Sequence, residues 1–97
     1  MEKNNKDEIA EISEELIKLL KDNDEKFWSE ILENIQAEYI KGKSKSLVAN
    51  EFIIIMRGGM GSFLDLVLHE NKKPLIEENN KLDELRYKLY KACKKIT

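Results

Sequence analysis

Cysteine, histidine and long apolar runs are all scarce in this chain, and each scarcity excludes a class of protein. One residue of the 97 is cysteine, Cys93, so no disulfide can form within the chain and nothing indicates an oxidising compartment. The longest apolar run, Phe52 to Met56, is five residues long, against the ~20 that a membrane-spanning helix needs. The polar N-terminus is not followed by the apolar segment of a secretory signal. We therefore expect a cytoplasmic protein with no membrane partner.

Residues that commonly carry chemistry are also few. His69 is the single histidine and lies 24 positions from Cys93, whereas structural zinc sites usually take paired cysteines and histidines, so we expect no metal and no cofactor. A nucleophile pair of Cys93 and His69 is an alternative. Cys93, however, lies on an apolar helical stripe, where a thiol behaves as a small hydrophobe. Adjacent carboxylates lack an evident apolar pocket that would separate their pKa values. We predict no catalytic residue and no enzyme activity.

What the sequence has in abundance is amphipathic helical patterning. From Asp7 to Lys21, apolar residues recur every three or four positions with charged residues between them, and the pattern repeats from Phe27 to about Ile40. The loop between these segments is short, so residues 1–40 are predicted to form an antiparallel helical hairpin. Phe27 and Trp28 are expected to anchor its second helix against the first.

Residues 46–57 have hardly any polar face, which predicts a central, buried helix. Ser46 is a good start signal for this helix and Gly58 a good stop signal. Three consecutive isoleucines favour a strand by propensity, so a strand at 52–56 stays open as the alternative.

The remaining residues predict a joint, a hairpin and a last helix. Glycines cluster at 58–62, alternation and a proline over 64–76 favour a short β-hairpin, and a leucine stripe over 80–96 favours a helix. The sequence thus predicts one domain over residues 1–97. Its fold is mostly α, with α+β as the alternative: a domain like a four-helix bundle, with a short β-hairpin before the C-terminal helix.

Charge is divided unequally along the chain. The net charge of −2 argues against a strongly basic nucleic-acid binder, but residues 1–40 hold 12 acidic and 5 basic side chains (−7), and residues 41–97 hold 7 and 12 (+5). Either the two halves neutralise each other, or the acidic hairpin docks onto a basic protein partner. The basic last helix lacks a nucleic-acid recognition motif. The candidate binding residues are Glu8, Glu11, Glu14, Glu15, Asp22 and Asp24.

A second candidate site is the glycine-rich segment from Arg57 to Ser62. Glycine reaches positive φ without penalty, and successive backbone amides in such a turn can cradle an anion beside a guanidinium and a hydroxyl. In the alternative, the glycines only end a helix and turn the chain, and their spacing matches neither the P-loop nor the dinucleotide motif. The candidate anion-binding residues are Arg57, Gly58, Gly59, Gly61 and Ser62.

The C-terminal part of the chain resembles a group of small, uncharacterised bacterial proteins. They carry Gly-Gly-Met-Gly-Ser, then Asp-Leu-Val-Leu, then a closing Leu-x-x-Leu-x-x-x-Leu-Tyr helix. The matching residues here are Gly58, Gly59, Met60, Gly61, Ser62, Asp65, Leu66, Val67, Leu68, Leu82, Leu85, Leu89 and Tyr90. Small, acidic proteins of this kind are similar to the immunity proteins encoded beside bacterial toxins. The resemblance implies binding and supplies no catalytic residue.

The leading functional prediction is therefore a small protein-binding module, an immunity or antitoxin-like protein that neutralises a basic toxin domain by binding it. One alternative is a small-ligand or anion-binding domain that uses the segment from Gly58 to Ser62. Another is a homo-oligomeric helical protein with a structural purpose.

Overall fold

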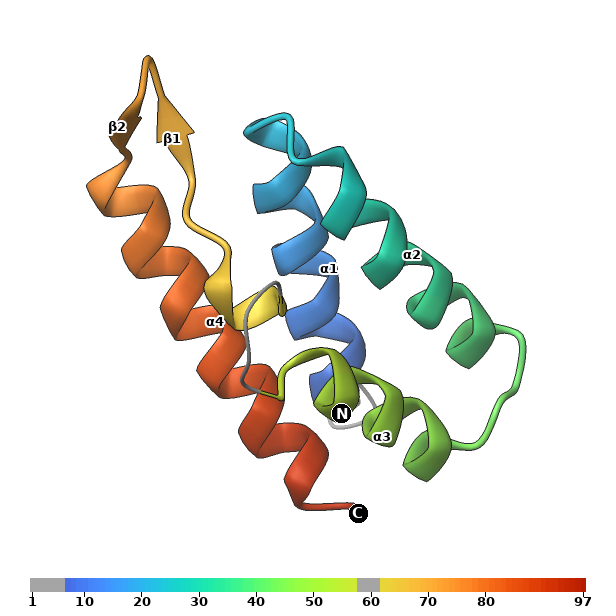
Figure 1. Cartoon of the computed structure of the whole chain (residues 1–97). Coiled ribbons are helices and arrows are strands. Elements are labelled where there is room, and N and C mark those ends of the chain that lie inside the picture. The colour runs from blue at the N-terminus through green and yellow to red at the C-terminus, as the bar shows by residue number, and fades with distance from the viewer. Residues whose placement is uncertain (1–6, 58–61) are drawn as a thin grey trace, which may run out of the picture.

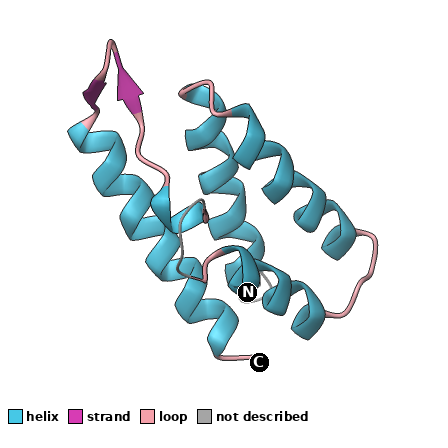
Figure 2. Cartoon of the chain, viewed as in Figure 1, coloured by secondary structure: helices cyan, strands magenta, loops and turns pink. Residues whose placement is uncertain are grey.

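A computed structural model describes residues 7–57 and 62–97, which form a bundle of helices with one small hairpin (Figure 1). The α-helices of these residues are α1 (Glu8–Asp22), α2 (Lys26–Ile40), α3 (Lys45–Ile55) and α4 (Ile76–Lys94). Between α3 and α4 lie a 3₁₀ turn, η2 (Phe63–Asp65), and the antiparallel strands β1 (His69–Glu70) and β2 (Lys73–Pro74). Figure 2 shows how little of the chain is strand. The predicted fold class is confirmed.

α1 lies at the centre of the bundle. It packs against α2 on one side and α4 on the other, and α3 contacts both α2 and α4 (Figure 1). The apolar stripes of the helices meet in one core, as amphipathic helices require. Its fully buried large side chains include Leu16, Leu20, Leu32, Phe52, Phe63, Leu82, Leu85 and Leu89. Among the described helices, none combines the length and apolarity needed to cross a bilayer.

Polar contacts add detail to the α1–α2 hairpin. Asp7 caps α1 by accepting a hydrogen bond from the Ile9 amide at 2.9 Å, and the Tyr39 hydroxyl at the far end of α2 donates to the same carboxylate. Ser13 is fully buried, and its hydroxyl accepts a hydrogen bond from the side-chain amide of Gln36 at 3.2 Å. These bonds satisfy polar groups that would otherwise be costly to bury.

The segment expected at 46–57 is a helix but is not central. α3 begins one residue earlier, after Ser44, and its last helical residue is Ile55. Only one face is buried, while Leu47 and Ile54 are each about half exposed. The prediction of full burial was wrong because α3 lies at the edge of the bundle, where it has neighbours on one side.

The predicted hairpin at 64–76 is much shorter than expected. Residues 63–65 form η2 instead of strand. The Arg86 guanidinium donates hydrogen bonds to the carbonyl of Phe63 at 2.6 Å and to that of Leu66 at 3.2 Å, and these bonds stand in place of strand pairing. The first strand thus starts only at His69.

The last helix also begins earlier than the predicted residue 80. α4 starts at Ile76, and Asn79 in its first turn bonds both the amide and the carbonyl of Leu68, at 2.7 and 3.0 Å. This side chain joins the hairpin to the helix, and only Leu75 separates β2 from α4.

The two adjacent aromatics of α2 have different roles. Trp28 packs on the ring of Phe63 with 5.1 Å between centroids, whereas Phe27 is largely exposed. Of the expected pair of anchors only Trp28 packs on the core, since adjacent helical positions face different directions. The ring that it contacts belongs to η2, whereas the sequence predicted contact with α1.

Candidate functional site

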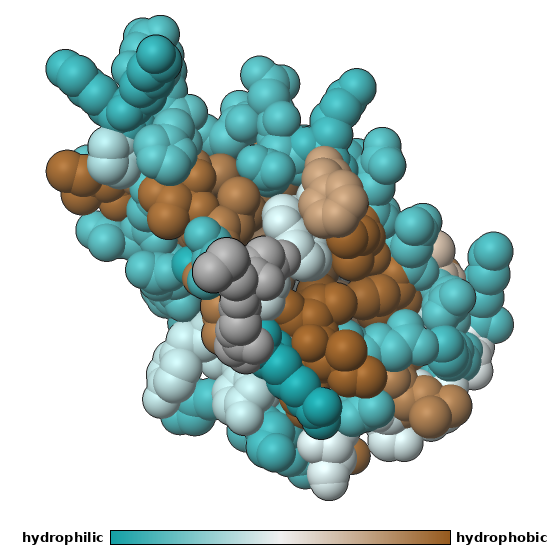
Figure 3. Space-filling model, viewed as in Figure 1, coloured by the Kyte–Doolittle hydropathy of each residue, from teal (hydrophilic) through white to brown (hydrophobic). Residues whose placement is uncertain are grey.

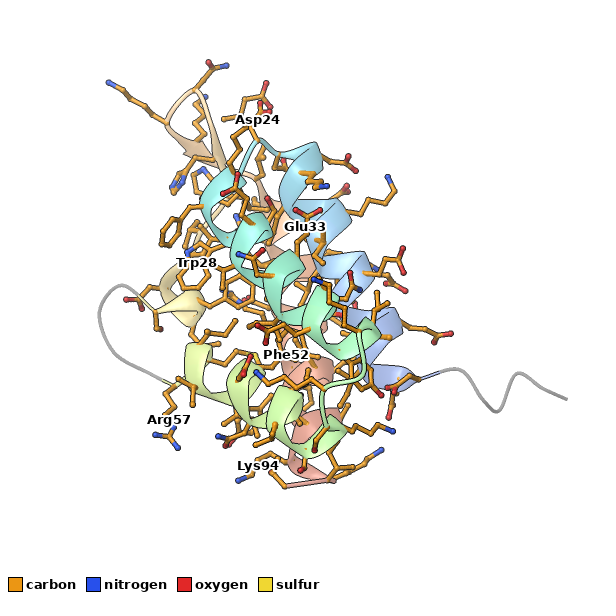
Figure 4. All side chains as sticks on the ribbon, turned by 90° about the vertical axis from the view of Figure 1, so that its right-hand side faces the viewer. Asp24, Trp28, Glu33, Phe52, Arg57 and Lys94 are labelled. Atoms are coloured by element: carbon orange, nitrogen blue, oxygen red, sulfur yellow. The ribbon has the colours of Figure 1, made fainter. Side chains whose placement is uncertain are left out.

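The first candidate surface is the outer side of α1. We call Glu8, Glu11, Glu14, Glu15 and Asp22 the acidic side of α1. All five are exposed, because the opposite side of the helix carries the buried residues from Ile9 to Leu20. They extend over a helix of 15 residues, about 22 Å at 1.5 Å per residue. Asp24 follows in the exposed turn to α2, with a φ of 58° (Figure 4).

Part of this acidic charge is neutralised within the chain. Lys95 lies 3.5 Å from Glu8, and Lys18 lies 3.2 Å from Asp22. Glu14, Glu15 and Asp24 form no ion pair with any other residue in the described ranges. The structure therefore brings the predicted acidic residues onto one helix and its following turn, and leaves half of that set available to a partner.

Other ion pairs join the acidic and basic halves. Lys43 pairs with Glu38 of α2 at 2.7 Å and with Glu51 of α3, and these hydrogen bonds raise the pKa of Lys43. Lys45 lies 3.5 Å from Asp7. The two halves do neutralise each other at these contacts, so mutual neutralisation and an exposed acidic side exist together.

The second predicted site is only partly within the described chain. Gly58, Gly59 and Gly61 lie outside the described residues. Arg57 is exposed and points away from the helices in Figure 4. The Ser62 hydroxyl accepts a hydrogen bond from the Leu64 amide at 3.2 Å and so caps η2. This bond gives the hydroxyl a structural role at the start of η2.

Sequence reasoning missed a third surface, an apolar groove beside α4. A hollow of about 540 Å³ lies between α3, η2 and α4, and a second of about 280 Å³ lies between the hairpin and α4. Both hollows are lined by Asp83 and Arg86, so they adjoin each other along α4. We call the exposed apolar residues along them the α4 groove: Leu64, Val67, Ile76, Tyr87 and Tyr90. Figure 3 shows hydrophobic side chains at the surface over α3 and beside the start of α4.

Arg86 forms the floor of this groove. It is 7% exposed, and its guanidinium donates to two carbonyls of the η2 region, pairs with Asp83 and lies 5.6 Å from the centre of the Phe63 ring. A buried guanidinium is tolerable only when its charge and donors are satisfied, as they are here. The signal in the sequence was a charged residue within the leucine stripe of the last helix, four positions after Leu82.

Cys93 and His69 do not meet. Cys93 is fully buried in the core, where burial, together with the charge of Asp7, raises the pKa of its thiol to about 12. His69 is exposed on β1. The reading of Cys93 as a core residue is confirmed, and a thiol with so high a pKa is a poor nucleophile. Within the described ranges, no three side chains of the metal-binding types are grouped to hold an ion.

Fold and surfaces together define a small helical-bundle domain with an acidic helix side and a separate apolar groove. The chain belongs to a family described as a domain of unknown function (DUF6966), whose model matches residues 21–76. The match begins near the end of α1 and ends at the first residue of α4. Comparisons with curated proteins and with solved structures found no match. Membership of an uncharacterised family is thus confirmed, and the likeness to immunity proteins stays a prediction.

Proposed function

We propose that this chain is a small protein-binding domain that works in the cytoplasm as an immunity or antitoxin-like protein and neutralises a basic toxin domain by binding it. The observation that carries the proposal is the acidic side of α1. Five exposed carboxylates follow one helix, and two of them, Glu14 and Glu15, form no ion pair with another residue in the described ranges.

The physical support is the way these charges are held. The backbone of α1 is fixed because six of its residues are buried against the bundle. A partner therefore meets charges at set positions along a rigid helix, and binding needs little ordering of the backbone. Complementary charge across such a face speeds encounter and disfavours partners of the wrong charge.

The test is a binding assay with the toxin domain encoded beside this chain. We expect a stable complex at moderate salt, protection of the cell when both proteins are expressed, and weaker binding as salt rises, because salt screens exposed charges. Unchanged killing together with no complex would contradict the proposal.

Charge reversal locates the face. Glu14→Lys with Glu15→Lys should weaken the complex at least tenfold, an effect of about 1.4 kcal/mol. The matched control, Glu30→Lys with Glu70→Lys, makes the same change in charge at exposed positions outside α1 and should change affinity less than threefold. Equal losses in the two variants would show a general charge effect and no α1 interface.

A second candidate function is binding of a small anion, and the hollow of about 540 Å³ favours it. Arg57 lies at its edge beside apolar and tyrosine side chains, and ligand sites have this volume and character. Titration with inorganic phosphate and with phenyl phosphate, followed by calorimetry, tests this function. Heat of binding that disappears in Arg57→Gln supports it, and no heat from either compound excludes these ligands.

A further inference from the structure

We propose that the α4 groove is a self-association surface, on which α4 of a second copy of this chain packs antiparallel. The groove and the acidic side of α1 are different surfaces, so this proposal does not depend on toxin binding. The hydrogen-bonded Arg86 in its floor keeps the groove in one shape for a partner to meet.

α4 carries two apolar stripes, and among the residues that the structure describes only one of them is buried. The inner stripe, which includes Leu82, Leu85 and Leu89, is buried. The outer stripe runs through Ile76, which is 73% exposed, then Tyr87, 62% exposed, and Tyr90, 40% exposed. Ile76 and Tyr87 are eleven positions apart, about three helical turns, and Tyr90 follows three positions later, so these residues lie on one side of the helix.

Leu64 and Val67 extend the outer stripe sideways. Both are nearly half exposed and line the two hollows next to α4. The surface is therefore a strip of apolar and tyrosine side chains, the residues typical of the buried centre of an interface. A standard interface takes ~800 Å² from each partner, about one eighth of the 6465 Å² surface of this chain.

The charges of α4 select a second copy as the occupant. Its first half holds Glu77, Glu78, Asp83 and Glu84 with one lysine, and the part after Arg86 holds Lys88, Lys91 and Lys94, followed by Lys95. An antiparallel α4 sets the acidic half of each copy against the basic half of the other, twice by symmetry. A parallel copy would set like charges together. The same distribution complements the dipole of a single helix, so the orientation has to be tested directly.

The antiparallel arrangement has a natural register. With the ends of the outer stripe aligned, Ile76 lies opposite Tyr90 of the second copy. Glu77 then lies at the level of residue 89 of that copy, between its Lys88 and Lys91. The two-fold axis then passes near Asp83. The carboxylate of Asp83 is paired with Arg86 in each copy, so its approach to the axis leaves no unpaired charge in the interface.

Sedimentation equilibrium tests self-association. Over roughly 10 μM to 1 mM protein we expect a monomer–dimer equilibrium in the wild type. Tyr87→Glu should raise the dimer dissociation constant at least tenfold, since it places a charge in the centre of the interface. Phe27→Glu, which changes an exposed aromatic residue on α2, is the matched control and should raise it less than twofold. Circular dichroism checks that both variants are folded.

Cysteine cross-linking tests the orientation. Ile76→Cys and Tyr90→Cys are oxidised separately and as a mixture, with the wild type as control for the buried Cys93. Antiparallel packing predicts a disulfide-linked dimer that contains one chain of each variant. A wild type that stays monomeric at the highest concentration overturns the proposal, even if the groove binds some other protein. Cross-linking of Ile76→Cys mainly to itself, or a loss of dimer in Phe27→Glu as large as in Tyr87→Glu, overturns the proposed arrangement.

Discussion

The α1–α2 hairpin and the segment from η2 to the first turns of α4 keep their shapes by different means. In the hairpin, two regular helices bury continuous apolar stripes, and polar bonds such as that of Ser13 with Gln36 add to a packing that already exists. In the later segment the backbone is irregular, and the side chains of Arg86 and Asn79 donate to the carbonyls of Phe63, Leu66 and Leu68. Loss of one polar side chain should therefore cost much more in the second region than in the first.

The largest expected effect is at Arg86. Arg86→Leu keeps much of the apolar stem but leaves the buried carbonyls of Phe63 and Leu66 without this donor. We expect the free energy of unfolding to fall by about 3 kcal/mol, measured by urea denaturation.

Lys88→Ala is the control for Arg86→Leu, because it removes a cation from the same helix at an exposed position. It should cost no more than about 0.5 kcal/mol. If both variants lost the same stability, the distinction between the two regions would not hold.

An effect of intermediate size on stability is expected from the ionisation of the Cys93 thiol. Its pKa is raised from 9.0 to about 12. Above pH 9 the unfolded chain thus releases a proton that the folded chain keeps, and stability falls as pH rises. Between pH 8 and pH 10 this group should remove about 1 kcal/mol from the free energy of unfolding.

Cys93→Ala isolates this contribution of the thiol. The variant is less stable at every pH, but its stability should fall less steeply between pH 8 and 10 than that of the wild type. In the wild type, a thiol reagent at pH 8 should react only as fast as the core opens. Parallel pH profiles for the two proteins, or rapid labelling of the native thiol, would show that Cys93 is accessible.

The smallest expected effect on stability is in the α1–α2 hairpin. Ser13→Ala removes the hydroxyl that accepts from Gln36 and donates to the carbonyl of Ala10 at 3.1 Å. Because alanine favours the helix and the surrounding packing remains, the loss should be about 0.5 kcal/mol. Thermal unfolding followed by circular dichroism measures it. A loss as large as that of Arg86→Leu would mean that the hairpin also depends on single polar contacts.

Helical periodicity was sufficient to predict the α1–α2 hairpin and the burial of Cys93 on the last helix. The helix at 52–56 was predicted from its start and stop signals, with a strand left open as the alternative. These features depend on short-range spacing. The short hairpin was predicted, but the true start of α4 and the two-residue length of β1 and β2 were not predictable in this way. They depend on bonds from Asn79 and Arg86 to residues 11 to 23 positions earlier in the chain.

The two candidate surfaces also differ in whether the sequence could predict them. The acidic side of α1 could be predicted, since the charges and the period of one helix place it outside. The α4 groove could not, because the hollows along it are lined by residues from α3, η2, the hairpin and α4.

The sequence by itself determined the helical class of this protein, the stripes that pack in its core and the acidic outer side of α1, because each follows from the period of a single helix. Only the tertiary structure decided that α3 lies at an edge, that Arg86 is buried and that a second apolar stripe of α4 stays exposed. Those outcomes depend on which helices become neighbours, and the spacing within any one segment does not specify that.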